Sequence, residues 1–321
     1  LKVLVADKFE KQGLDGLAAL GCDVVNRPDA GADLPRHLAE VQPAVLVVRS
    51  SKVAKPAFDA APALQGVIRA GAGYDTIDLA AAKAKGVAVC NTPGMNSVAV
   101  AELTFALLLA LDRRLVEQTV EARAGSWNKK EYSKARGLKG LTLGLIGVGA
   151  IGREVIRRAK AFAMPCWAHS LNMTPDRALD LGVQYGGKTR ADLYAMLAQC
   201  DVVSVHVAAN QESQKMCDAT FFAAMKPGAI FLNTSRGSVV DDDALINAIK
   251  SKGLRAGLDV YPGEPSAGAA QWKWPGADLP GVVLAHHIGA STDQAQFAVA
   301  DEVVRMVKVF RDKGAWENRV A

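Results

Sequence analysis

The sequence has few cysteines and no closely spaced pair of them. Five cysteines are scattered over 321 residues, and no two of them are separated by only two positions. Disulfide-rich domains and zinc sites both need several cysteines close together, so this distribution favours neither. It is compatible with a reducing compartment, and we expect a cytoplasmic protein.

Long apolar runs are also lacking. The longest run, Leu103 to Leu111, is about half of the ~20 residues that a membrane-spanning helix needs. The first residues, Leu1 to Asp7, are typical of a short strand rather than of a signal peptide. Because 50% of the residues are apolar and 22% are charged, we expect a soluble globular protein with no membrane partner.

The sequence shows no strong excess of charge of one sign. The net charge is +5, without the basic stripe that nucleic-acid-binding proteins present. This mild positive charge fits a small anionic ligand better than nucleic acid. The chain is also long enough for two domains, each with a sizeable core.

Short apolar runs alternate with helical patterns, which predicts an α/β protein with parallel sheets. In the first part of the chain, we expect strands at residues 3–6, 24–25, 45–48, 67–70 and 87–90, followed by a long buried helix from Ser97 to Leu111. A polar, lysine-rich stretch at residues 125–140 then interrupts the pattern.

A second series of strands follows this stretch. We expect these strands at residues 143–146, 166–169, 202–206, 229–233, 257–260 and 282–285, and a final helix from about 293 to 310. The two series predict two domains of the Rossmann-like or flavodoxin-like kind, each built on its own parallel sheet.

The strand predicted at residues 143–146 leads directly into a glycine-rich turn and then a helical pattern. The turn reads Gly147-Val148-Gly149-Ala150-Ile151-Gly152. Between a strand and a helix, this spacing predicts a dinucleotide site: the first glycine allows a tight turn, the second lets the backbone approach the pyrophosphate, and the third allows close helix packing. We expect cofactor contacts from Gly147, Gly149, Ala150, Ile151 and Gly152.

The carboxylate that usually follows such a turn by about 20 residues is missing. The next strand ends at Ser170-Leu171-Asn172, and the first carboxylate after it is Asp176. Ser170 and Asn172 can hydrogen-bond a ribose hydroxyl but cannot repel a 2′-phosphate, and no arginine adjoins them in the sequence. We expect NAD, with Ser170 contacting it, and NADP stays open.

Three strand ends in the second series carry reactive side chains, namely Arg236, Glu264 and His287. Ligands of open α/β sheets bind at the carboxyl ends of the strands. An arginine can hold a carboxylate with two hydrogen bonds and polarise a neighbouring carbonyl. A histidine can exchange a proton near neutral pH, and a glutamate can orient its imidazole. Together they predict hydride transfer between a nicotinamide and the C2 of a small 2-hydroxy acid.

With these segments the chain resembles the D-isomer-specific 2-hydroxyacid dehydrogenase family over essentially its whole length. Two further segments, at residues 69–75 and 91–97, are typical of that family. The resemblance implies that Arg236, Glu264 and His287 are the catalytic residues and that Asp259 faces the nicotinamide. It also implies cofactor contacts from Val207, Thr234 and Ala290.

The resemblance further implies a topology. Residues 1–96 and 290–321 would form the substrate domain, and residues 97–289 the NAD(P)-binding Rossmann domain. The substrate would lie in a cleft between them that closes to exclude water. Such proteins usually form dimers through the helix near Ser97–Leu111, so we expect a homodimer or a larger homo-oligomer.

Two positions depart from the family pattern. His286 stands where a proline usually precedes the catalytic histidine, and Ala208 replaces another frequent proline. Both departures could alter nicotinamide affinity, and neither removes a reacting group. A metal shared by His286 and His287 is disfavoured, because adjacent residues of an extended segment point to opposite sides. We expect no metal site.

Cations at the ends of two first-domain strands suggest the substrate. Arg49 and Arg69 lie there with Lys52 nearby, a set that suits a second anionic group, unless each arginine only pairs with a local carboxylate. The pattern is similar to that of 3-phosphoglycerate dehydrogenases, which implies a role in serine biosynthesis. Compared with the longer members of that group, we expect a short form without a C-terminal regulatory domain. The expected substrate contacts are Arg49, Lys52, Arg69, Ala72 and Gly73.

Two alternatives remain. One is a hydroxypyruvate or glyoxylate reductase that runs the reaction in the opposite direction with NADPH. The other is a protein that senses nicotinamide cofactors without turnover, because a fold alone proves no activity. The complete set of Arg236, Glu264 and His287 argues against the second.

Overall fold

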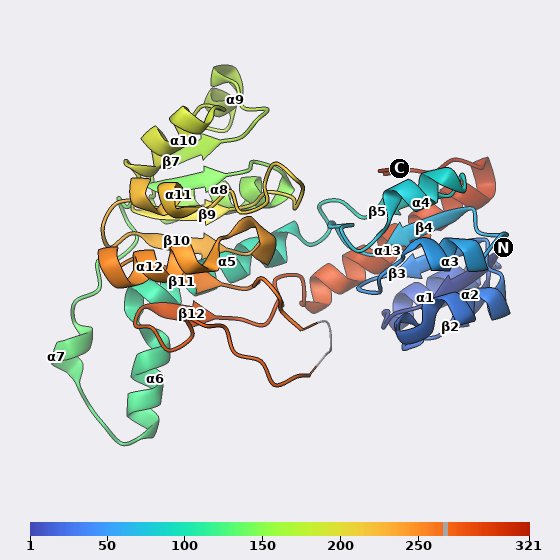
Figure 1. Cartoon of the computed structure of the whole chain (residues 1–321), viewed down its shortest axis with the longest axis horizontal. Helices are drawn as coiled ribbons and strands as arrows, with labels where there is room; N and C mark the ends of the chain where they lie inside the picture. The colour runs from blue at the N-terminus through green and yellow to red at the C-terminus, as the bar shows by residue number, and fades with distance from the viewer. Residues whose placement is uncertain (266–268) are drawn as a thin grey trace. The chain divides into compact units, whose positions relative to one another are not determined.

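The structure is a computed structural model that describes residues 1–265 and 269–321. The chain divides into two compact units (Figure 1). The first unit contains Leu1–Asn96 and Ala290–Ala321, and the second contains Ser97–Gly289. Each unit is built around its own sheet of parallel strands, as the sequence predicts.

The first unit has a five-stranded parallel sheet in the order β2-β1-β3-β4-β5. Its core strands are apolar and buried on both faces, as expected for a parallel sheet covered by helices. The strands are β1 (Lys2–Val5), β2 (Asp23–Asn26), β3 (Val45–Val48), β4 (Gly66–Arg69) and β5 (Ala88–Asn91).

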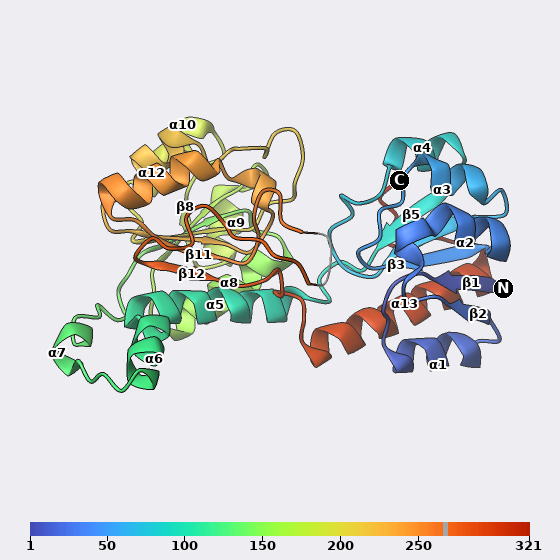
Figure 2. The same ribbon diagram turned by 60° about the horizontal axis from the view of Figure 1, so that its bottom comes forward.

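Helices cover both faces of this sheet (Figure 2). One face packs against η1 (Ala30–Asp33), α2 (Leu34–Val41), α3 (Lys55–Ala60) and α4 (Leu79–Ala84). The other face packs against α1 (Lys11–Ala19) and α13 (Asp293–Lys313). The C-terminal helix therefore completes a unit that is otherwise made from the first residues of the chain.

The second unit has a seven-stranded parallel sheet in the order β12-β11-β10-β9-β6-β7-β8. Its strand order reverses between β9 and β6, and ligands of open α/β sheets bind at such a reversal. The strands are β6 (Leu143–Ile146), β7 (Cys166–His169), β8 (Gln184–Tyr185), β9 (Val202–Val205), β10 (Ile230–Asn233), β11 (Arg255–Leu258) and β12 (Val282–Leu284).

This sheet is also covered on both faces (Figure 2). The long helix α5 (Ser97–Arg113) and α8 (Ala150–Ala161) pack on one face, with α9 (Pro175–Asp180) beside them. The opposite face holds α10 (Arg190–Leu197), α11 (Ala219–Ala224), η2 (Gly237–Val239) and α12 (Asp242–Lys252).

Two further helices, α6 (Leu115–Arg123) and α7 (Lys129–Tyr132), extend away from the seven-stranded sheet (Figure 1). Neither helix has a buried residue. Large apolar side chains are exposed along this extension, namely Leu115, Val116, Val120 and Trp127. Nowhere in the described residues is there a helix with the length and apolar composition needed to cross a membrane.

Several element boundaries differ from the sequence prediction. Strand β11 ends at Leu258 rather than at Val260, and the Asp259 carbonyl oxygen after it accepts the N–H group of His287. The last helix continues to Lys313 and ends where Gly314 adopts a left-handed conformation. Helices α6 and α7 and the short strand β8 were not predicted, because none of them buries a regular apolar face.

Candidate functional site

The turn between β6 and α8 requires glycine at two positions. Gly147 has φ +89°, and a Cβ there would lie 2.3 Å from the His206 carbonyl oxygen. A Cβ at Gly152 would lie 2.5 Å from the Gly147 carbonyl oxygen. In contrast, a Cβ at Gly149 would meet no described atom within 4 Å, so this backbone is open to a ligand.

Helix α8 begins at this turn without a side-chain cap. The N–H groups of its first turn, at Ala150 and Ile151, are therefore available to an anion. Together with the open backbone at Gly149, they form a cradle that fits a dinucleotide pyrophosphate.

A pocket of about 520 Å³ opens beside this turn. It is lined by the glycine turn, by the end of β7 and by the loop that follows β9. Four of the expected cofactor residues line it, namely Gly147, Gly149, Ser170 and Val207. Thr234 and Asp259 lie instead at the ends of β10 and β11, and Ala290 belongs to the first unit.

The same pocket contains arginines that the sequence analysis missed. No arginine adjoins Ser170 in the sequence, but Arg177 lines the pocket with it. The Arg177 guanidinium donates hydrogen bonds to the carbonyl oxygens of Asn172 and Val148, both at 3.2 Å. Lys188 and Arg190, from the segment before and at the start of α10, line the pocket as well. The fold, rather than adjacency in the sequence, brings these cations into the pocket that Ser170 lines.

The loop after β10 holds Arg236 through the side chain of Asn233. The Asn233 amide nitrogen donates to the Arg236 carbonyl oxygen at 2.9 Å, and its oxygen accepts from the Ser235 N–H at 3.0 Å. A Cβ at Gly237 would lie 2.0 Å from the Tyr261 carbonyl carbon, so the loops after β10 and β11 touch through their backbones. This contact brings Arg236 to the loop that carries Glu264.

Glu264 and His287 form a hydrogen-bonded pair. The Glu264 Oε1 atom bonds the Nδ1 atom of His287, and Glu264 Oε2 accepts the Tyr261 N–H at 2.9 Å. Burial opposes ionisation of Glu264, but the hydrogen bonds from His287 and Tyr261 and the charge of Arg236 together lower the pKa of its carboxyl. The His287 side chain is 48% exposed. Because its Nδ1 is engaged, Nε2 is the ring nitrogen that can meet a ligand.

Asp259 fixes the loop on which His287 lies. Its two carboxylate oxygens accept the N–H groups of Ile288 and Gly289, both at 2.8 Å, and its carbonyl oxygen accepts the His287 N–H at 2.7 Å. Burial raises the pKa of the Asp259 carboxyl, although these N–H groups oppose the rise. His287 has φ +54°, so its backbone is left-handed rather than extended, which corrects the assumption used to weigh a shared metal.

Tyr261 links the same two loops from the other side. Its hydroxyl lies 3.0 Å from the Leu258 carbonyl oxygen and 2.6 Å from the Ala285 carbonyl oxygen. The residues that position Glu264 and His287, namely Asp259 and Tyr261, therefore tie the end of β11 to the segment after β12. Within the described residues, no cluster of three or more His, Cys, Asp or Glu side chains could hold a metal ion.

In the first unit, Arg49 and Arg69 lie at the ends of adjacent strands. Val48 pairs with Arg69 in the register of β3 and β4, and Arg49 follows directly. The Arg69 guanidinium lies against Gly71, where a Cβ would be 1.4 Å from Nη1. Lys52 is exposed, and Ala72 and Gly73 are partly buried in the loop after β4.

Asp7, which the sequence analysis did not select, organises the loop after β3. Its carboxylate accepts the N–H groups of Arg49 at 2.6 Å and of Ser50 and Ser51 at 3.0 Å, and the Ser51 hydroxyl at 2.7 Å. Burial raises the pKa of Asp7, but these hydrogen bonds outweigh it and the pKa is lowered. Asp7 thus contacts Arg49 at the backbone N–H group of Arg49.

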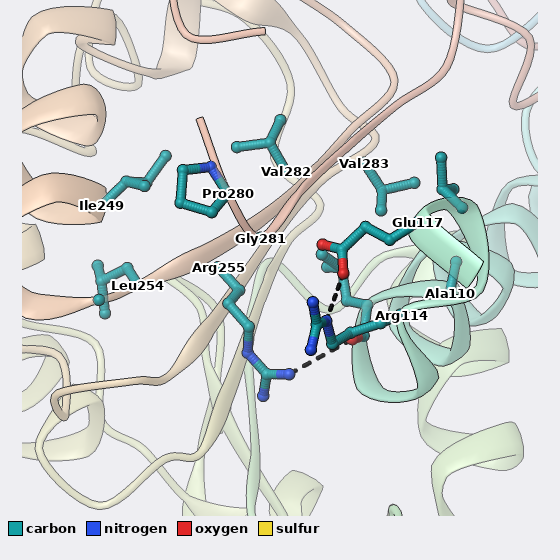
Figure 3. Close-up of a pocket in the computed structure, with 13 residues that line it drawn as sticks. Ala110, Arg114, Glu117, Ile249, Leu254, Arg255, Pro280, Gly281, Val282 and Val283 are labelled. Atoms are coloured by element: carbon teal, nitrogen blue, oxygen red, sulfur yellow. Dashed lines mark hydrogen bonds and ion pairs between the residues drawn. The ribbon is translucent and has the colours of Figure 1, made fainter. Parts of the chain in front are cut away.

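Another hollow, of about 310 Å³, lies between the start of α6 and the segment before β12 (Figure 3). Its charged side chains bond within the protein: Arg114 pairs with Glu117, and Arg255 donates to the Leu111 carbonyl oxygen at 3.4 Å. The rest of its lining is mainly apolar. The Glu117 carboxylate of this hollow is paired with Arg114, whereas the loops around His287 place a glutamate beside an imidazole.

Comparison with known proteins assigns the second unit. Residues 105–289 match the protein-family model of the D-isomer specific 2-hydroxyacid dehydrogenase NAD-binding domain. The chain belongs to the D-isomer specific 2-hydroxyacid dehydrogenase family. This confirms the family and the fold class expected from the sequence, and it identifies the chain as an NAD(P)-dependent oxidoreductase.

Three curated members of the family illustrate its range. The chain is 40% identical to a hydroxypyruvate reductase of Thermotoga maritima, over 88% of each chain. It is 38% identical to a glyoxylate reductase of Thermococcus litoralis, over 83% of this chain and 80% of the relative. It is 35% identical to a D-3-phosphoglycerate dehydrogenase of Archaeoglobus fulgidus, over 96% of this chain but only 58% of the relative.

Solved structures of other proteins share the whole fold of this chain. The TT0316 protein of Thermus thermophilus matches with a TM-score of 0.86 and 32% identity, over 100% of both chains. A glyoxylate reductase from Paecilomyes thermophila matches with a TM-score of 0.87 and 28% identity, over 99% of this chain and 98% of that one. The fold shared with these structures therefore spans both units of this dehydrogenase.

Proposed function

We propose that the protein interconverts a small D-2-hydroxy acid and the corresponding 2-keto acid, with Arg236, Glu264 and His287 as its catalytic residues. The hydrogen bond between Glu264 and His287 carries the proposal, because it orients a proton-transferring imidazole beside a guanidinium. The pocket next to Gly149 would hold NAD(P), which would supply the acceptor or donor of the hydride at the substrate C2.

Each side chain has a distinct task. The Arg236 guanidinium holds the substrate carboxylate and polarises the C2 carbonyl. The His287 Nε2 atom takes the hydroxyl proton during oxidation and returns it during reduction. Glu264, bonded to Nδ1, fixes the ring orientation and stabilises the protonated imidazole. Oxidation would thus leave the hydroxyl proton on His287 and a 2-keto acid as the product, with the hydride accepted by the bound NAD(P).

We propose that the first unit selects the substrate and that the second unit binds the cofactor. The adjacent cations Arg49 and Arg69, supported by Lys52 and by the backbone at Ala72 and Gly73, would bind a second anionic group. This arrangement favours 3-phosphoglycerate or a similar doubly anionic acid. The phosphoglycerate dehydrogenase of Archaeoglobus fulgidus, at 35% identity, is consistent with this choice.

A second candidate is reduction of hydroxypyruvate or glyoxylate. The reductases of Thermotoga maritima and Thermococcus litoralis have the higher identities, 40% and 38%, and match this chain over 80% or more of their own length. In this case the two first-unit arginines would contribute less, because these acids carry only one anionic group.

Steady-state kinetics in both directions distinguish the two candidates. The substrates are 3-phosphoglycerate, phosphohydroxypyruvate, hydroxypyruvate and glyoxylate, each with both cofactors. The first candidate predicts that phosphorylated substrates have the highest kcat/KM and that Arg49→Ala and Arg69→Ala reduce it. It is wrong if the wild type ignores phosphorylated acids or if both variants keep full efficiency on them.

We also propose that the protein self-associates through α5, α6 and α7. The extension of α6 and α7 buries none of its residues, and Trp127 is 87% exposed. Apolar patches of this kind mark interaction surfaces. Light scattering should show a dimer or larger oligomer that Val120→Glu weakens. A monomer at micromolar concentration would contradict this proposal.

The five cysteines, all buried free thiols, suit a cytoplasmic location.

A further inference from the structure

The cofactor pocket is strongly cationic at the end of β7. Three of its lining residues are cations, namely Arg177, Lys188 and Arg190, and one, Glu212, is a carboxylate. The position after the strand, where an acidic residue would bind the ribose 2′-hydroxyl and repel a 2′-phosphate, is Ser170. The pocket therefore lacks the usual obstacle to a 2′-phosphate and surrounds its place with positive charge.

We propose that this wall of the pocket binds the 2′-phosphate of NADP(H), so that the enzyme prefers NADP(H) to NAD(H). The inference rests on the proposed function only in requiring that a dinucleotide occupies this pocket. Ser170 would donate its hydroxyl to the phosphate, and Arg177 and Lys188 would supply charge. This assignment answers the question of cofactor choice that the sequence leaves open.

Arg177 is held in place before any ligand binds. Its Nη1 and Nη2 atoms donate to the carbonyl oxygens of Asn172 and Val148. Val148 belongs to the glycine turn, so the guanidinium is fixed to the same backbone that would face the pyrophosphate. An arginine fixed in this way loses little conformational entropy when it binds an anion.

The other two cations differ in how strongly they are neutralised. Arg190 already bonds the Asp218 carboxylate at 2.9 Å and the Tyr194 hydroxyl at 3.0 Å. Lys188 is exposed, its backbone N–H bonds Asp192 at 3.2 Å, and its ammonium pairs with no described residue. Lys188 is therefore the cation whose charge is most available to a phosphate, and the best residue to test.

Calorimetric titration tests the proposal without any substrate. The probes are adenosine 2′,5′-bisphosphate and 5′-AMP, which differ by the 2′-phosphate, together with NADPH and NADH. We expect the wild type to bind the bisphosphate about tenfold or more tightly than 5′-AMP, as one charge-assisted hydrogen bond can supply. NADPH should bind more tightly than NADH by a similar factor.

Two variants and a matched control locate the effect. Lys188→Met should weaken the bisphosphate several-fold and leave 5′-AMP unchanged, whereas Lys139→Met, at an exposed lysine outside the pocket, should change neither. Ser170→Asp should reverse the preference towards NADH. Thermal unfolding verifies that each variant is folded, and Lys188 is exposed enough to be replaced safely.

The proposal is overturned if the wild type binds NADH as tightly as NADPH, or if Lys188→Met weakens both adenosine probes equally. Catalytic assays separate this failure from failure of the proposed function. Turnover of 2-keto acids with NADH alone would refute the cofactor preference and leave the function intact. Selective NADPH binding without turnover of any 2-keto acid would refute the proposed function and leave the cofactor preference intact.

Discussion

The carboxyl edges of the two sheets differ in how they hold their charged side chains. In the second unit, Glu264 bonds His287 directly, and Asp259 and Tyr261 fix the loops beneath them. In the first unit, the Asp7 carboxylate accepts hydrogen bonds from the backbone N–H groups of Arg49 and Ser51. A group that moves a proton needs a fixed ring and a fixed partner, whereas a group that only attracts an anion needs a fixed backbone and a free charge. We therefore propose that the second edge serves catalysis and that the first serves substrate selection.

Replacement of the imidazole should have the largest effect. His287→Ala should lower kcat/KM by roughly 10²–10⁴, the usual contribution of a general acid or base, with little loss of stability because the side chain is exposed. With the cofactor at saturating concentration, the matched control is His286→Ala, because His286 is also exposed and directly adjacent. An equal loss in the two variants would mean that His287 has no special role.

Loss of the Glu264 charge should have a somewhat smaller effect. Glu264→Gln keeps the size of the side chain but cannot stabilise a protonated imidazole, and kcat should fall by about 10²-fold or more. The variant should still unfold cooperatively. A rate close to that of the wild type would show that the bond to His287 is structural only.

On the first edge, removal of a cation should act on one class of substrate. Arg49→Ala or Arg69→Ala should lower kcat/KM for phosphorylated acids by about 10- to 100-fold, the value of a charge-assisted hydrogen bond. The same variants should change kcat/KM for glyoxylate little. Arg36→Ala serves as control, since Arg36 is an exposed arginine of the same unit that pairs with Asp33 and Glu40. Equal losses on both substrate classes would remove the distinction between the edges.

The smallest effect concerns stability. Asp7→Ala leaves three backbone N–H groups without their acceptor and should cost about 1–3 kcal/mol of unfolding free energy at pH 7. Because the pKa of Asp7 is lowered by folding, its contribution is fully present above the unfolded pKa of about 3.9. It is lost as the pH falls through the folded value. Chemical unfolding at pH 7 and near pH 3 should show the difference between wild type and variant shrinking in acid.

Much of this organisation could be predicted from local sequence patterns. Apolar runs such as Val45–Val48 and Leu143–Ile146 indicated both sheets, because strands buried on two faces are continuously apolar. The glycine turn was recognisable because one of its steric requirements, the close approach of Gly152 to the Gly147 carbonyl oxygen, lies within the strand–turn–helix unit itself. The hydrogen bond between Glu264 and His287 agrees with the expectation that these groups converge.

The missed features depend on contacts between remote segments. Arg177 enters the cofactor pocket because α9 folds back over the glycine turn, which no adjacency to Ser170 reveals. Asp7 lies two residues after the end of β1, and the pairing of β1 with β3 brings it to the loop that contains Arg49. Helix α6 presents exposed apolar side chains, so its pattern lacked the buried stripe that predicts a helix.

The most direct test of the catalytic role of the Glu264–His287 pair is the pH dependence of kcat/KM for 2-keto acid reduction, measured for wild type and Glu264→Gln. Reduction needs a protonated imidazole, which the carboxylate stabilises. The activity of the variant should therefore begin to fall at a lower pH than that of the wild type. Coincident pH profiles, differing at most in height, would contradict the assignment of His287 as a proton donor supported by Glu264.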